Sequence, residues 1–246
     1  MIALRRLTAV EFRLFLREKV GPIFGLGFPL VLLIIFGNIP FFNQPGDTYG
    51  GLTVLDVYVP ILIAFVITML AINFLPATLA GYREKGILRR LGTTPAGPVR
   101  VLAAQLLVNV AVIAVAVAVL LLVGRFGFDV TLPRQFGAFL LTAVLTTTAM
   151  IAIGLFIAAA APTGRIANAA GATLFYVLMT FAGLWIPIQA MPAVLQHISR
   201  ATPLGAAVTA FQAAGEGRWP SAVQLVTLVA YAVAAGAAAA RMFRWE

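Results

Sequence analysis

Six long stretches of this chain contain no Asp, Glu, Lys or Arg, and each exceeds the roughly 20 residues that a helix needs to cross the hydrocarbon core of a bilayer. Leu, Val, Ile, Ala and Phe make up most of each stretch. The stretches are Val20–Gly46, Val57–Tyr82, Val101–Gly124, Gln135–Gly164, Ile166–Ser199 and Trp219–Ala240. This spacing of charges indicates a protein that crosses a membrane several times.

The overall composition supports the same interpretation. Hydrophobic residues make up 62% of the chain and charged residues 10%, whereas water-soluble domains carry about 25% charged residues. Hydrocarbon offers no partner to free backbone N–H and C=O groups, so each span must satisfy its own hydrogen bonds as a helix. We therefore predict an all-α membrane protein in which residues 1–246 form one transmembrane domain with six transmembrane helices.

The basic residues are distributed unevenly between the two sides of the membrane. With the N-terminus inside, 13 of the 17 Lys and Arg residues fall in inner segments and 4 in outer ones. This bias predicts cytoplasmic N- and C-termini, and it accounts for the net charge of +9 without a nucleic-acid partner. The inner residues are Arg5, Arg6, Arg13, Arg17, Lys19, Arg83, Lys85, Arg89, Arg90, Arg100, Arg165, Arg241 and Arg244, and the outer ones Arg125, Arg134, Arg200 and Arg218.

Residues 2–19 have the pattern of an amphipathic helix that lies along the inner membrane surface. Apolar side chains share one side of the helix and arginines share another. The apolar side comprises Ala3, Leu7, Val10 and Leu14, and the basic side Arg6, Arg13 and Arg17. We predict an N-terminal interfacial helix.

The fifth stretch, Ile166–Ser199, is too long for one crossing, and we predict one span over about Ile166–Ile186 followed by an outer segment, residues 187–220, that contains several prolines. Two short helices are predicted within it, at approximately Pro192–Ser199 and Pro203–Ala214. Helices that are this short and apolar are expected to dip into the outer membrane interface as re-entrant helices between the fifth and sixth spans.

The chain offers few residues for catalysis or metal binding. It has no cysteine and one histidine, His197, which is expected to be an ordinary surface residue. Its two lysines, Lys19 and Lys85, each follow a glutamate, so the Gly-Lys-Ser/Thr of a phosphate-binding P-loop is missing. The spans also lack the interior charged residues of ion-coupled transporters. We predict no catalytic residue, no metal site and no nucleotide hydrolysis by this chain.

A short basic segment, residues 81–98, joins the second and third stretches. It reads Gly-Tyr-Arg-Glu-Lys-Gly-Ile-Leu-Arg-Arg-Leu-Gly-Thr-Thr-Pro-Ala-Gly-Pro. Basic residues alone would suffice to set the membrane orientation, but an apolar patch in so short a polar segment predicts a partner surface as well. The patch comprises Ile87, Leu88 and Leu91, with Arg83, Arg89 and Arg90 around it and Gly81 and Gly92 as the expected helix breaks.

Residues 82–98 resemble the cytoplasmic loop after the second span in permeases of type-2 ATP-binding-cassette (ABC) exporters, and residues 186–217 are similar to the outer region of that family. With the surface helix and the six spans, the resemblance covers essentially the whole chain. It implies a permease of the bacterial plasma membrane, most similar to drug and antibiotic exporters. The residues that match the coupling segment, which docks on the nucleotide-binding subunit, are Arg83, Glu84, Lys85, Gly86, Leu88, Arg89 and Arg90.

The resemblance also implies partners and a substrate path. Two permeases, here expected to be a homodimer surrounded by membrane lipids, combine with two ATPase subunits that bind ATP and Mg²⁺, so no cofactor is expected in this chain. The path lies between the permeases and is lined by the second and fifth spans. Candidate residues in these spans are Phe65, Thr68, Thr173, Tyr176 and Thr180, for which plain packing is the alternative.

Other functions stay open on the sequence alone. An exporter of lipids or polysaccharides would share the same family frame. A membrane-embedded enzyme would depend on His197, and a scaffold or channel component would show neither vectorial transport nor stimulated ATPase activity.

Overall fold

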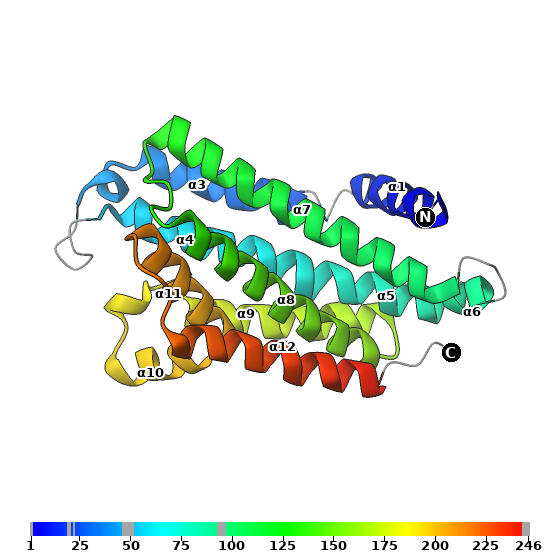
Figure 1. Cartoon of the computed structure of the whole chain (residues 1–246). Coiled ribbons are helices and arrows are strands. Elements are labelled where there is room, and N and C mark those ends of the chain that lie inside the picture. Colours follow the sequence, from blue (N-terminus) through cyan, green and yellow to red (C-terminus); the bar gives the residue numbers. More distant parts are fainter. Residues whose placement is uncertain (1, 19–20, 22, 46–51, 93–96, 243–246) are drawn as a thin grey trace.

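The structure, a computed structural model, describes residues 2–18, 21, 23–45, 52–92 and 97–242. These residues form a bundle of helices (Figure 1). Within the described ranges no sheet forms, and one isolated bridge pairs Pro45 with Thr53. The all-α class predicted from the charge-free stretches is confirmed.

Most helices run along the bundle axis (Figure 1). The elements that make up the five longest continuous helices are α4 (Val54–Thr68), the π-helical η4 (Met69–Phe74) and α5 (Leu75–Glu84), which are continuous, and α7 (Gly97–Phe128), α8 (Phe136–Ala160), α9 (Gly164–Ala182) and α12 (Ala222–Met242). The shorter ones are α1 (Ile2–Arg17), η1 (Ile23–Gly27), α3 (Phe28–Asn38), η2 (Pro40–Asn43), α6 (Ile87–Gly92), η5 (Ile188–Ala190), α10 (Ala193–Ala201) and α11 (Pro203–Gly215).

Five helices in the described residues are long and apolar enough to cross a membrane. They are Val54–Glu84, which joins α4, η4 and α5, and then α7, α8, α9 and α12. The first predicted span instead forms a shorter apolar helix, Ile23–Asn38, because Ile39 is extended and Pro40 begins a 3-10 turn. Its 16 residues extend about 24 Å, so six crossings stay a prediction.

The short helices divide between the two ends of the bundle (Figure 1). Helix α6 and the end of α12 lie toward one end, with α1 alongside the bundle on that side, whereas η2 and α10 lie at the other. This arrangement agrees with the predicted pairing of the N-terminal helix and the basic segment on one side of the membrane.

The N-terminal helix α1 confirms the predicted amphipathic helix over Ile2–Arg17, and Lys19 lies outside the described residues. It packs on α7. Leu4, Thr8, Glu11 and Phe15 are turned inward. Of the predicted apolar side, Leu7 is half-buried, whereas Val10 and Leu14 are exposed. The predicted apolar side is therefore only partly exposed, and the face with Glu11 contacts the protein.

Both predicted outer helices are present. Helix α10 follows Pro192, and α11 starts at Pro203 with the Thr202 hydroxyl accepting the Gly205 N–H at 3.1 Å. Helix α11 is largely buried and packs on α8, α9, α12 and α4. Since its surroundings are mainly protein, it belongs to the core of the bundle; its depth in the membrane stays a prediction.

The core is built around the helix Val54–Glu84, the most buried of the crossing helices. Three neighbouring residues contact backbone carbonyls of its π-helical part, η4: one by a hydrogen bond and two by close packing. Asn109 of α7 donates to the Leu70 oxygen at 3.0 Å, so this amide joins two helices. At Gly154 of α8 and Gly171 of α9, a Cβ would overlap the oxygens of Ala71 and Ile72.

We expect Gly171→Ala to destabilise the protein because its Cβ would push against the Ile72 carbonyl. Overpacking of this kind costs about 1–3 kcal/mol. Gly127→Ala on α7 is the matched control, since a Cβ there meets nothing within 4 Å. Thermal unfolding of the purified proteins in detergent should show a lower Tm for Gly171→Ala only. Equal Tm values for the two variants would contradict the close packing.

Candidate functional site

The basic segment forms two helices joined by a sharp turn. Helix α5 ends at Glu84 and α6 begins at Ile87. Gly86 lies between them with a φ of +67°, a conformation that L-residues rarely adopt. The predicted break at Gly81 is wrong, because Gly81 lies inside α5; the break occurs five residues later, where Gly86 permits the left-handed backbone. Residues 93–96 of the predicted segment 81–98 lie outside the described residues.

Two residues of the segment attach it to the turn between α8 and α9. The Arg83 guanidinium donates to the carbonyl of Ala161 and, at 3.4 Å, to that of Ala159. The Glu84 carboxylate accepts the backbone N–H of Gly164 at 3.0 Å. An acid at the start of α9 also interacts favourably with the helix dipole. Arg83 and Glu84 therefore bind within the chain and join the α5–α6 turn to the α8–α9 turn.

The remaining residues of the segment divide into buried and exposed ones. Leu88 is 3% exposed, and its helix α6 packs on α5 and α7. The predicted apolar patch thus has part of its partner surface within the same chain. Lys85, Arg89 and Arg90 are exposed. These three cations form the outward-facing side of the segment, which we call the basic face.

A buried polar cluster lies behind the segment. The Glu11 carboxylate of α1 accepts the Tyr82 hydroxyl at 2.8 Å and the Gln105 amide at 2.5 Å. Glu11 is only 6% exposed, and this burial raises the pKa of its carboxyl above the ordinary value of 4.5. The cluster connects α1 and α7 to Tyr82 in the last turn of α5, at the start of the basic segment.

We expect Glu11→Ala to lower the Tm and Glu11→Gln to preserve it at acid pH. Alanine leaves the Tyr82 and Gln105 donors without their acceptor, at a cost of about 1–3 kcal/mol, whereas the glutamine carbonyl can accept both. Thermal unfolding of the two variants beside the unchanged protein measures this difference. An equal loss in both variants would contradict the role of this side chain as a hydrogen-bond acceptor.

The raised pKa also predicts a pH dependence. The folded protein holds the Glu11 proton more tightly than the unfolded chain, so its stability falls as the pH rises from 4.5 through the pKa in the folded state. Glu11→Gln removes this loss. The Tm of Glu11→Gln relative to the unchanged protein should therefore be higher at neutral pH than at pH 4.5. A difference independent of pH would contradict the assignment.

The five candidate residues of the substrate path fall into two groups. Phe65 and Thr68 on α4 are buried; the Phe65 ring packs edge-to-face on Phe175 at 5.0 Å, and the Thr68 hydroxyl donates to the Ala64 carbonyl. Thr173, Tyr176 and Thr180 are all exposed on one side of α9. The structure therefore places only the α9 residues on a surface.

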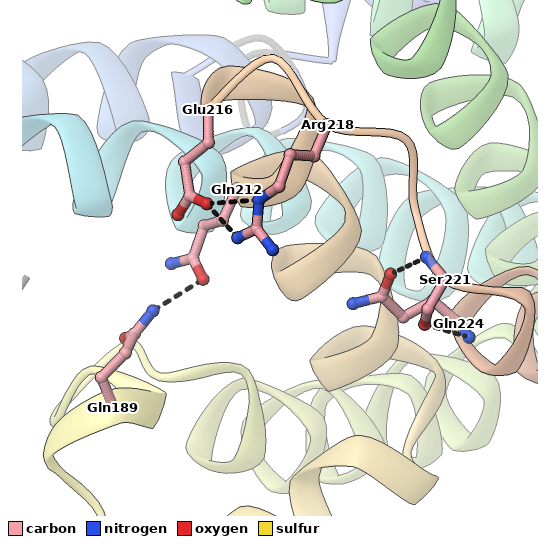
Figure 2. Close-up of polar contacts among 6 residues, drawn as sticks. All are labelled: Gln189, Gln212, Glu216, Arg218, Ser221 and Gln224. Atoms are coloured by element: carbon pink, nitrogen blue, oxygen red, sulfur yellow. Dashed lines mark hydrogen bonds and ion pairs between the residues drawn. The ribbon is translucent and has the colours of Figure 1, made fainter. Parts of the chain in front are cut away.

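A cavity of about 570 Å³ lies at the opposite end of the bundle, between α4, α11 and the loop before α8. Figure 2 shows part of its polar wall, where the Gln189 amide donates to Gln212 at 2.8 Å and Glu216 pairs with Arg218. The same view shows Ser221 and Gln224 at the start of α12. Asp56 and Arg134 also line the cavity. Its volume lies in the range of small-molecule sites.

Sequence reasoning missed this cavity and the Glu11 cluster. Acidic residues within a basic amphipathic helix and glutamines beside the outer prolines were the available signals, but neither shows which residues meet. His197 is exposed on α10. Among the residues that the structure describes, no group of three His, Cys, Asp or Glu side chains could hold a metal ion.

Comparisons with known proteins identify the family. The ABC-2 type transporter family matches residues 2–214, which is most of the chain. A comparison with curated proteins finds no match. The family match includes the surface helix, the basic segment and the outer helices, so it agrees with the resemblance noted in residues 82–98. Taken with the five long apolar helices, this match shows that the chain belongs to the ABC-2 type transporter family and is a multi-pass membrane component of an ABC transporter.

Proposed function

We propose that the chain is the permease of an exporter that is driven by a separate ATPase docking on the basic face. The proposal rests on one observation: some residues of the segment contact the bundle, whereas others are exposed. Arg83, Glu84 and Leu88 fasten it to the bundle, while Lys85 and Arg89 point outward. A segment held rigidly on one side and charged on the other is suited to receive force from a second protein.

The packing supports a route for that force into the membrane. Helix α5 carries the segment at its end, and α9 is held against it closely. At Gly164 a Cβ would lie 3.0 Å from the Ala77 oxygen, and Gly171 meets the Ile72 carbonyl. Closely packed interiors transmit displacement with little compression. Movement of α6 would therefore shift α9 together with α5.

The exposed side of α9 is the proposed substrate path. It offers two hydroxyls and a phenol from Thr173, Thr180 and Tyr176 beside the apolar Val177. Such a surface suits a hydrophobic or amphipathic small molecule, such as a drug or antibiotic, and it would be enclosed by a second copy of the chain. The cavity near Asp56 and Arg134 would receive polar groups on the release side.

The remaining components follow from the family. ATP and Mg²⁺ would be bound by the ATPase subunits. The complex would lie in the bacterial plasma membrane with both termini of the permease in the cytoplasm.

We expect Lys85→Ala combined with Arg89→Ala to weaken capture of the partner ATPase on the order of ten-fold, because charge pairs across an interface govern encounter and register. Copurification of the ATPase from membranes and ATP-dependent uptake into inverted vesicles are the measurements. Arg125→Ala is the matched control, an exposed arginine near the other end of α7. Unchanged capture and uptake in the double variant would exclude docking on the basic face.

The proposed homodimer can be tested by cross-linking, since the chain contains no cysteine. Tyr176→Cys places a single thiol on α9 where the side chain is 61% exposed, and Val226→Cys places one on α12 at 64% exposure. If two α9 helices face each other, a thiol cross-linker should yield dimers with Tyr176→Cys and far fewer with Val226→Cys. Equal yields would place the second copy elsewhere.

A further inference from the structure

A second groove of about 550 Å³ lies between α1 and α7, on the same side of the bundle as the basic face. Its walls are almost entirely apolar. The Thr8 hydroxyl already donates to the Leu4 carbonyl at 2.9 Å. Arg5 is the only charged residue of the lining. The lining residues are Leu4, Arg5, Thr8, Ala9 and Phe12 from α1, and Leu107, Val108 and Ala111 from α7.

The groove opens toward the region that lipid chains occupy. Leu107 is 50% exposed and Val110 on the same helix 45%, and large exposed apolar side chains on a crossing helix face hydrocarbon. On the other wall, Phe12 is 43% exposed. Because α1 has the amphipathic character of a helix at the headgroup boundary, the groove extends from that boundary into the acyl layer.

The charge at the groove is unbalanced. Arg5 is exposed and has no ion-pair partner among the described parts of the chain. Glu11, the acid inside α1, cannot neutralise it, because its carboxylate is buried against Tyr82 and Gln105. Arg6, Arg13 and Arg17 add further exposed cations to the same helix. The ligand that matches both the apolar walls and the positive charge of this groove is an anion with a long apolar tail.

We propose that this groove is a binding site for one anionic glycerophospholipid from the leaflet on the side of the basic face. An acyl chain lies between Phe12 and Leu107, and the phosphate contacts the Arg5 guanidinium. Clustered basic residues at a membrane surface select anionic over zwitterionic lipids. The site does not depend on the proposed export function.

The site can be tested with a tryptophan reporter in the groove. After replacement of Trp185, Trp219 and Trp245 by Phe, Phe12→Trp supplies a single fluorophore. The protein is reconstituted in vesicles of phosphatidylcholine that contain either brominated phosphatidylglycerol or brominated phosphatidylcholine. We expect the anionic brominated lipid to quench with about five-fold higher apparent affinity.

Three further variants distinguish a specific site from general lipid contact. Arg5→Gln in the Phe12→Trp protein should abolish the preference for phosphatidylglycerol, whereas Arg17→Gln should keep most of it. Val226→Trp on the exposed face of α12 should show equal quenching by both lipids.

Three results would overturn the proposal. They are equal quenching of Phe12→Trp by the two lipids, a preference that survives Arg5→Gln, and absence of quenching by either lipid, which would mean that protein fills the groove. Leu107→Trp on the opposite wall provides the same test if the Phe12 variant does not fold.

Discussion

The backbone of the helix Val54–Glu84 is the surface on which the rest of the bundle is assembled. Gly154, Gly164 and Gly171 let α8 and α9 approach its carbonyls and Cα atoms closely, and Asn109 of α7 donates to one of them. Close backbone approach through small residues is how helices associate where lipid removes the hydrophobic drive. The π-helical stretch η4 lies at this contact, as π-bulges often do at functional positions.

This arrangement brings together parts of the chain that are far apart in sequence. Glu84, at the end of the central helix, binds the first residue of α9. Tyr82, two residues earlier, binds Glu11 near the chain's start. The last turn of α5 therefore contacts the N-terminal helix α1 and the turn between α8 and α9, and it leads into the basic segment. Because all of these contacts lie within one chain, they exist before any partner docks.

Burial separates residues of the basic segment that look equivalent in sequence. Arg83 and Arg89 are both arginines of the same short segment, yet one is bound to the carbonyls of the α8–α9 turn and the other is exposed. Leu88 is buried within the chain and is unavailable to a partner. The proposed docking surface is therefore narrower than the seven matched residues and comprises the exposed basic face Lys85, Arg89 and Arg90.

The spacing of charges determined the all-α membrane class and the position of the basic segment, because hydrocarbon permits few backbone solutions. The prolines determined the two short helices after Pro192 and Thr202, because proline restricts where helices begin. Tertiary structure decided what depends on distance between helices: the shorter first helix, the break at Gly86 in place of Gly81, the Glu11 cluster, and the burial of Phe65 and Thr68. Apolar helices show weak periodicity, since lipid and protein interior favour similar side chains, so the face that each helix turns inward is set by packing against its neighbours.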